Sequence, residues 1–127
     1  MNVLGIGIDI VENARIRGIM ERHGAHFLER VFTPVEREYC GVMKDPAPFY
    51  AARFAAKEAV AKAFGTGIGA DISWLDMEVQ RAASGKPSIL LRGAGADLAR
   101  RMGVSEVLIT LSHSEHYAVA QAMLISA

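Results

Sequence analysis

The sequence predicts an α+β domain in which an antiparallel sheet packs on one long buried helix. Segments of alternating apolar residues stand near both ends of the chain, and an alanine-rich segment of strong helix formers lies between them. The last two alternating segments are joined by a short polar turn, which favours antiparallel pairing. No repeat, low-complexity tract or long linker divides the 127 residues, so we expect a single domain over residues 1–127.

The first strand and the first helix follow one another directly. Residues 1–10 (MNVLGIGIDI) alternate apolar with small residues, and the predicted strand ends in an acid, Asp9. Residues 11–22 carry apolar side chains at loosely helical spacing, with arginines on the other faces, so a helix is predicted there. Histidine and glycine at 23–24 end this helix.

A second helix is predicted from a start pattern in which Thr33 is followed by Pro34 and Glu36. Threonine can cap free amides, proline fits the first helical turn, and an acid favours the positive end of a helix. We expect a short helix from here to about Met43.

The most distinctive element is the helix that begins near residues 45–48 and runs to Phe64, where Gly65 ends it. At about 100° per residue its charged side chains form two pairs on neighbouring faces. These pairs are Arg53 with Lys57 and Glu58 with Lys62. Because the rest of the surface is apolar, the helix must be buried in the domain or covered by a second subunit.

The second half of the chain is predicted to hold short elements separated by turns. They are, in order, a strand at 74–80, a turn at 84–87, a strand at 88–91, a helix at 93–103, a strand at 107–111, a polar turn at 112–116 and a strand at 117–125.

Composition and charge exclude several classes of protein. The 14 Lys and Arg balance 14 Asp and Glu, and the pI is near 6.9, so no overall field favours nucleic acid or an anionic membrane. A single cysteine, Cys40, excludes an internal disulfide. No basic-then-apolar leader is present, and no apolar run approaches the ~20 residues of a membrane span. We therefore expect a cytoplasmic protein.

Two acids and a lysine are candidates for a site. Asp9 follows an apolar run, where a carboxylate needs a partner, a metal or a role as a strand-end cap. Glu58 and Lys62 are one turn apart, and such a pair on an ordinary surface helix adds only about 0.3–0.5 kcal/mol. Here the neighbouring residues are apolar, so an unpaired charge would be costly, which favours a functional site over a surface ion pair. Two carboxylates with a nearby cation are what a magnesium diphosphate site requires.

Three further groups are weaker candidates. Residues 65–69 (GTGIG) could let amides approach a phosphate, or could simply cap the preceding helix. Residues 112–116 (SHSEH) could hydrogen-bond a phosphate or cap a turn, while zinc binding and a serine nucleophile are disfavoured. Arg15, Arg17 and Arg22 form either a solvated face or a surface for an acidic partner.

Taken together, these segments resemble the holo-[acyl-carrier-protein] synthases, the small bacterial class of 4′-phosphopantetheinyl transferases. The matching segments are GIGIDIVENARIR, FTPVEREYC, RFAAKEAVAKAFGTGIG, WLDMEV, GKP and LSHSEHYAVAQAML. The resemblance implies transfer of the 4′-phosphopantetheine arm of coenzyme A to a serine of apo acyl carrier protein, a step of fatty acid biosynthesis that releases adenosine 3′,5′-bisphosphate. It also implies a homotrimer with active sites between subunits.

The resemblance further implies roles for individual residues. Asp9 and Glu58 would ligate Mg²⁺, and Lys62 would contact the phosphates. The cleft for coenzyme A, the co-substrate, would be lined by Arg53, Lys62, Gly65, Thr66, Gly67, Lys86, Pro87, Ser112 and His113. Arg15 and Arg22 match basic positions that meet the acidic carrier protein. A further basic position of that surface is Ala25 here, which predicts a weaker or differently placed carrier contact.

In the implied mechanism the carrier serine attacks the β-phosphorus of coenzyme A in line, and Lys62 neutralises charge on the leaving bisphosphate. Glu58, directly or through a water, is the first choice for the base, and Asp9 is the second. Two other classes would use parts of the same set. A Mg-dependent nucleotide phosphohydrolase would release inorganic phosphate and ignore carrier protein. A non-catalytic coenzyme A-binding module would be indifferent to Glu58→Gln.

Overall fold

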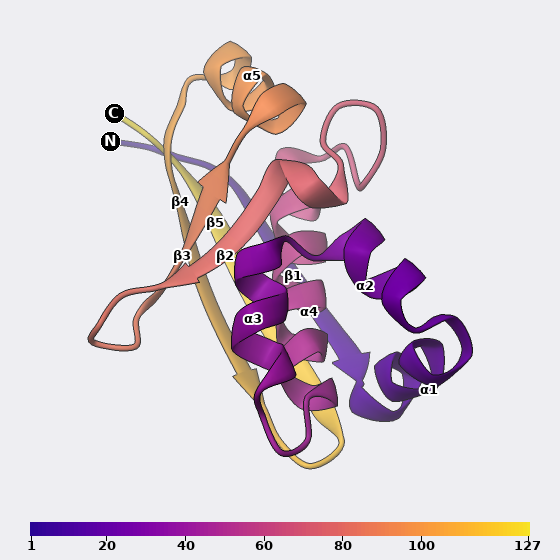
Figure 1. The fold of residues 1–127 in the computed structure, drawn as a ribbon. Helices are drawn as coiled ribbons and strands as arrows, with labels where there is room; N and C mark the ends of the chain where they lie inside the picture. Colours follow the sequence, from indigo (N-terminus) through magenta and orange to yellow (C-terminus); the bar gives the residue numbers. More distant parts are fainter.

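The computed structural model describes all residues 1–127 as two small antiparallel sheets around a central helix (Figure 1). The larger sheet has the order β1-β5-β4, with β1 (Val3–Glu12), β5 (Tyr117–Ser126) and β4 (Val104–His113). The smaller sheet pairs β2 (Met77–Arg81) with β3 (Pro87–Leu91). The central helix α4 (Ala47–Phe64) packs against the larger sheet and forms most of the core.

Of the other helices, two pack against α4, and the last α-helix lies at one end of the molecule against β4 (Figure 1). These other helices are α1 (Asn13–His23), α2 (Ala25–Val31), α3 (Pro34–Gly41), α5 (Gly93–Met102) and a short 3₁₀ helix η1 (Trp74–Asp76). The two termini lie side by side (Figure 1), and the Ser126 amide donates to the Asn2 carbonyl oxygen at 2.9 Å. No helix combines the length and hydropathy that crossing a membrane requires.

The predicted α+β class and the antiparallel pairing are confirmed. The helix start at Thr33 is confirmed as a capping box, in which Thr33 and Glu36 exchange hydrogen bonds between side chain and backbone. Gly65 has a φ of 81° and ends α4 as expected.

Some bounds and two segments differ from the sequence prediction. β1 continues to Glu12, where the helix is predicted from residue 11, and β4 continues to His113, through the first two residues of the predicted turn. Residues 74–76, predicted as the start of a strand, form η1, because Ser73 and Asp76 make a capping box that closes a tight turn before β2 begins. Residues 25–31 form α2, although no element is predicted there. A helix of this length has too few turns to show a periodic pattern.

Two glycines let the backbone of β1 touch the backbone of α4. A Cβ atom on Gly7 would lie 2.0 Å from the Ala59 carbonyl oxygen, and one on Gly5 would lie 2.2 Å from the Ala63 carbonyl oxygen. Ala59 is itself fully buried. The GxG pattern of this strand therefore serves close packing of strand on helix. Asp9, two residues beyond Gly7, shares its face of the strand and is directed towards α4.

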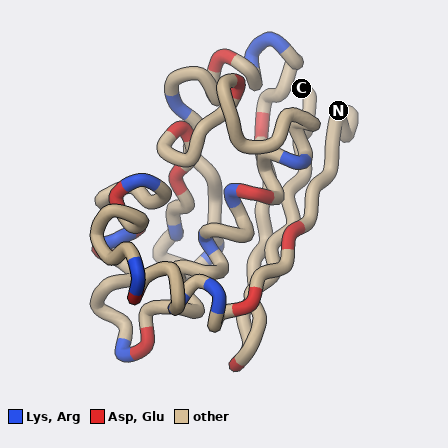
Figure 2. Tube along the Cα trace, turned by 90° about the vertical axis from the view of Figure 1, so that its right-hand side faces the viewer, with Lys and Arg blue, Asp and Glu red and all other residues tan.

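The opposite face of β1 is apolar and exposed. Ile6, Ile8 and Ile10 alternate with the residues that face α4, and their exposed fractions are 63%, 62% and 63%. Figure 2 shows that the three strands of this sheet are almost free of charge, and the few charged residues on them are acidic.

Candidate active site

Asp9, Glu58 and Lys62 come together where β1 crosses α4. The Lys62 Nζ donates to the Asp9 Oδ1 at 2.9 Å and to the Ile8 carbonyl oxygen at 3.1 Å. Glu58 lies one turn earlier on α4 and is half-buried. The Asp9 side chain is 17% exposed and that of Lys62 is 50% exposed, so the group is open to solvent on the lysine side. The strand and helix thus bring together acids that are far apart in the sequence.

The pKa of Glu58 is set by its burial and by the charges around it. Burial raises the pKa of Glu58, and the negative charge of Asp9 raises it further. The positive charges of Lys62 and Arg15 oppose this rise. No side chain donates a hydrogen bond to Glu58. A second cation between these carboxylates would relieve their repulsion.

The donor set fits a hard divalent ion such as Mg²⁺. The two carboxylates supply oxygen ligands, and no group of three or more acidic, histidine or cysteine side chains surrounds them. Mg²⁺ commonly binds one or two protein carboxylates and takes its other ligands from water and substrate phosphates. Asp9 and Glu58 are therefore the residues that would hold it.

Arg15 is exposed on α1 but lies close to Glu58. Its guanidinium carbon is 5.7 Å from the centre of the Phe54 ring, and the Phe54 ring stacks on Trp74 with 4.9 Å between centres. Arg22 is exposed in the last turn of α1. Arg17 instead pairs with Asp45 at 2.9 Å. Of the three arginines on α1, Arg15 is thus the one that adjoins both the aromatic pair and Glu58.

The backbone amides of the glycine turn after α4 donate hydrogen bonds to the end of that helix. The Gly65 amide donates to the Lys62 carbonyl oxygen at 2.9 Å, and the Gly67 amide donates to the Ala61 carbonyl oxygen at 3.2 Å. Its role as a helix C-cap is therefore clear. Thr66 is exposed between these glycines, and its hydroxyl donates to the Gly67 carbonyl oxygen at 2.9 Å.

Arg53 lies in a second place, on a neighbouring face of α4. It is 2% exposed, and its guanidinium carbon stands 4.2 Å from the centre of the Tyr39 ring. Nη1 donates to the Phe49 carbonyl oxygen at 3.3 Å, while Nε has no partner and no carboxylate forms an ion pair with this arginine. A buried guanidinium without a counter-ion is a strong candidate for binding an anion.

A hollow of about 320 Å³ opens beside Arg53. It is lined by Val35, Tyr39, Arg53, Val79, Gln80 and Arg81. The Arg81 guanidinium carbon is 5.4 Å from the Tyr39 ring centre, so two arginines flank one tyrosine. Sequence reasoning did not select Tyr39 or Arg81. The available signal was a basic residue at the end of a predicted strand, just before the turn that contains GKP.

The remaining predicted residues lie elsewhere in the single chain. Lys86 is exposed in the β2–β3 turn, which projects from the body of the molecule, and Pro87 begins β3 (Figure 1). Ser112 and His113 end β4, where the His113 ring is 4.8 Å from the Phe49 ring. No hydrogen bond or ion pair joins these four residues to Asp9, Glu58 or Lys62.

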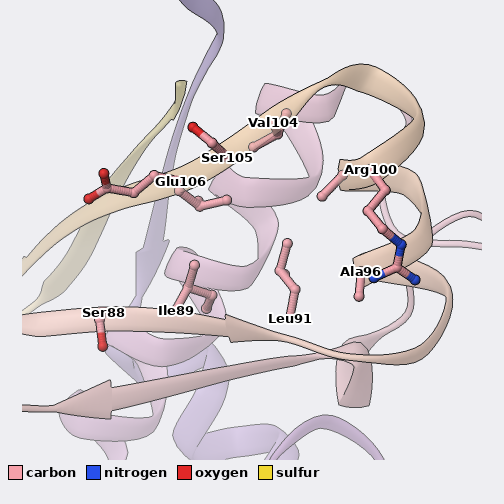
Figure 3. Close-up of a pocket in the computed structure, with 10 residues that line it drawn as sticks. Ser88, Ile89, Leu91, Ala96, Arg100, Val104, Ser105 and Glu106 are labelled. Carbon is pink, nitrogen blue, oxygen red and sulfur yellow. The ribbon is translucent and has the colours of Figure 1, made fainter. Parts of the chain in front are cut away.

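A further hollow of about 400 Å³ lies between β3, α5 and β4 (Figure 3). Its floor is apolar, and Arg100 and Glu106 stand at its rim. It contains none of the residues predicted for the site.

Comparison with known proteins identifies the class to which this fold and site belong. A family model described as the 4′-phosphopantetheinyl transferase superfamily matches residues 5–122, and the chain belongs to this family. A relative from Anaeromyxobacter dehalogenans (strain 2CP-C), named Holo-[acyl-carrier-protein] synthase, is 51% identical over 125 residues, which cover 96% of this chain and 95% of the relative.

Two solved structures have the same fold. The holo-[acyl-carrier-protein] synthase from Neisseria meningitidis has a TM-score of 0.91 and 34% identity, covering 98% of this chain and 100% of the other. The holo-[acyl-carrier-protein] synthase from Helicobacter pylori, in complex with coenzyme A, has a TM-score of 0.85 and 33% identity, covering 94% and 99%.

Proposed function

We propose that this chain transfers the 4′-phosphopantetheine arm of coenzyme A to a serine of apo acyl carrier protein and releases adenosine 3′,5′-bisphosphate. The observation that carries the proposal is the meeting of Asp9 from β1 with Glu58 and Lys62 from α4, within a chain that matches the transferase family over residues 5–122. Asp9 and Glu58 would hold Mg²⁺, which when bound supplies positive charge to the diphosphate.

Lys62 and Glu58 have distinct tasks in this reaction. The half-exposed ammonium of Lys62 is placed to neutralise the charge that develops on the leaving bisphosphate. Glu58 is the first choice of base for the serine hydroxyl, directly or through a water, because no side chain donates a hydrogen bond to it. Asp9 already accepts a hydrogen bond from Lys62, so it is the second choice.

The nucleotide end of coenzyme A would enter the hollow beside Arg53. Its phosphates would supply the anion that this buried guanidinium lacks, and Arg81 would add a second positive charge. Thr66 would offer a hydroxyl after α4. The other lining residues that we propose are Gly65, Gly67, Lys86, Pro87, Ser112 and His113.

We further propose that the chain assembles as a homotrimer with its active sites between subunits. Ile6, Ile8 and Ile10, on one face of β1, are exposed and form the type of apolar patch that marks an interface. A hollow of about 450 Å³, lined by Ile6, Gly7, Ile8, Lys62 and Gln121, connects this patch to the lysine of the site. A neighbouring copy on this face would bring its own strand ends or turn towards Lys62.

The trimer has its own test. Light scattering should give the mass of three chains for the wild type, and Ile8→Asp should reduce it to a monomer with loss of transfer. A fully active monomeric wild type would contradict the assembly.

Arg15 and Arg22 are the proposed contacts for the carrier. Both are exposed on α1, and Arg15 adjoins the acidic pair, so a carrier bound there would present its serine near Glu58. A cytoplasmic location agrees with the single cysteine, which is unpaired and buried.

Intact-mass spectrometry of apo carrier protein tests the function directly. With this chain, coenzyme A and Mg²⁺, the carrier should gain one phosphopantetheine, and adenosine 3′,5′-bisphosphate should appear. An unmodified carrier with release of inorganic phosphate would favour a phosphohydrolase, and neither change would favour a binding module.

A further inference from the structure

A buried ion pair joins α4 to the elements around it. The Lys57 Nζ donates to the Glu36 Oε1 at 2.7 Å, and both side chains are fully buried. The same ammonium donates to the Val31 carbonyl oxygen at 2.7 Å and to the Trp74 carbonyl oxygen at 3.1 Å. All three hydrogens of the ammonium are therefore used, and they are directed to α3, to the end of α2 and to η1.

The carboxylate of Glu36 extends this set of contacts. Its Oε1 also accepts from the Thr33 amide at 2.8 Å, and its Oε2 accepts from the Val79 amide of β2 at 2.7 Å. Glu36 thus completes the capping box of α3 and binds the middle of β2. Together Lys57 and Glu36 bind four backbone groups from separate segments.

Several of the elements that meet at this pair carry or adjoin parts of the proposed site. Lys57 is the neighbour of Glu58 on α4, and Arg53 lies one turn earlier. The carbonyl of Trp74 accepts from Lys57, while its ring stacks on Phe54, over which Arg15 lies. β2 leads to Arg81 and to the turn that contains Lys86.

Directional bonds to charged groups fix distances and angles more tightly than apolar contacts do. Apolar side chains of similar volume could fill the same space, but they would remove the side-chain partners of the Thr33 amide, the Val79 amide and the Val31 carbonyl. The pair therefore specifies how α2, η1 and β2 sit on α4.

We infer that Lys57 and Glu36 are positioning residues for the transfer reaction, which set the carrier-binding and coenzyme A-binding elements relative to Glu58. This inference rests on the proposed function. Neither residue touches a substrate, since both are fully buried, so each acts through the elements it holds.

The test uses Lys57→Met and Glu36→Gln, with Leu124→Ala as a matched control. Leu124 is fully buried on β5, so its truncation destabilises the core without touching the ion pair. All proteins are assayed at a temperature where circular dichroism shows them folded. Glu36→Gln keeps the volume and one acceptor oxygen, so it remains informative if Lys57→Met does not fold.

We expect both ion-pair variants to lower kcat by roughly tenfold or more and to raise the KM values for both substrates, because the reacting groups are misplaced. Trp74 is the only tryptophan, so its emission and its quenching by acrylamide report the junction directly. Both signals should change in the ion-pair variants and stay unchanged in Leu124→Ala, which should keep wild-type kinetics.

Two outcomes are distinguishable. If the wild type transfers nothing, the proposed function fails, and the Trp74 signals still decide whether the pair sets the junction. If a folded Glu36→Gln or Lys57→Met protein has wild-type kinetics and wild-type Trp74 signals, the positioning role is overturned.

Discussion

Replacing Gly7 by alanine would test whether close packing of β1 on α4 creates the site. The new Cβ would lie 2.0 Å from the Ala59 carbonyl oxygen, and ordinary contact begins at 3.4 Å, so strand and helix must separate by about 1.4 Å. The nearby atoms are backbone atoms, which cannot rotate away. Overpacking of this kind costs about 1–3 kcal/mol in the free energy of unfolding.

The same displacement would disturb the 2.9 Å contact between Lys62 and Asp9. Because misplacement of reacting groups by about 1 Å can cost roughly 100-fold in rate, kcat should fall by about that factor. Steady-state transfer kinetics and urea unfolding would measure both effects. Gly41→Ala is the matched control, since its Cβ would meet only the Tyr50 hydroxyl at 3.9 Å. A Gly7→Ala protein with wild-type kcat and stability would refute this account of the packing.

Three other predictions concern separate regions. Charge reversal of Arg15 and Arg22 should raise the KM for carrier protein far more than the KM for coenzyme A, and equal effects would remove these arginines from the carrier interface. Burial raises the pKa of Cys40 to about 12, so its thiol should react with Ellman's reagent only after unfolding, and rapid reaction of the folded protein would contradict this. Burial alone would raise the pKa of Glu78, but hydrogen bonds and the charge of Arg92 lower it overall. A carboxyl whose pKa is lower in the folded protein stabilises the fold at pH values above its unfolded pKa, and this stabilisation is lost as the pH falls through the folded pKa. Glu78→Gln should therefore reduce the free energy of unfolding at pH 7 and reduce it much less in acid. A loss that grows towards acid would have the wrong sign.

Local patterns predicted the elements well where one signal dominates. The helix ending at Gly65 and the capping box at Thr33 depend on neighbours in the sequence, so they could be found without a structure. The 3₁₀ turn at 74–76 could not, because alternating residues satisfy a strand pattern equally well and the Ser73–Asp76 bonds decide between them.

The site shows the same division between local and tertiary information. Asp9, Glu58 and Lys62 could be nominated because charged residues stand out in apolar segments, and the structure brings all three together. The partners of Lys57 could not be predicted. Sequence spacing pairs it with Arg53 on the helix, whereas the fold pairs it with Glu36 from α3. Arg81 likewise gains significance only when β2 places it across Tyr39.

The central claim is that Asp9 and Glu58 share one divalent ion beside the diphosphate of coenzyme A. Titration of Mn²⁺ followed by electron paramagnetic resonance, in the presence of coenzyme A, measures this most directly for the wild type, Asp9→Asn and Glu58→Gln. Each variant should keep its fold but bind Mn²⁺ much more weakly than the wild type. Loss of a residue that only supports a metal ligand costs roughly tenfold or more in metal affinity, and loss of a ligand itself should cost well over tenfold. Equal Mn²⁺ affinity in the wild type and either variant would contradict the claim.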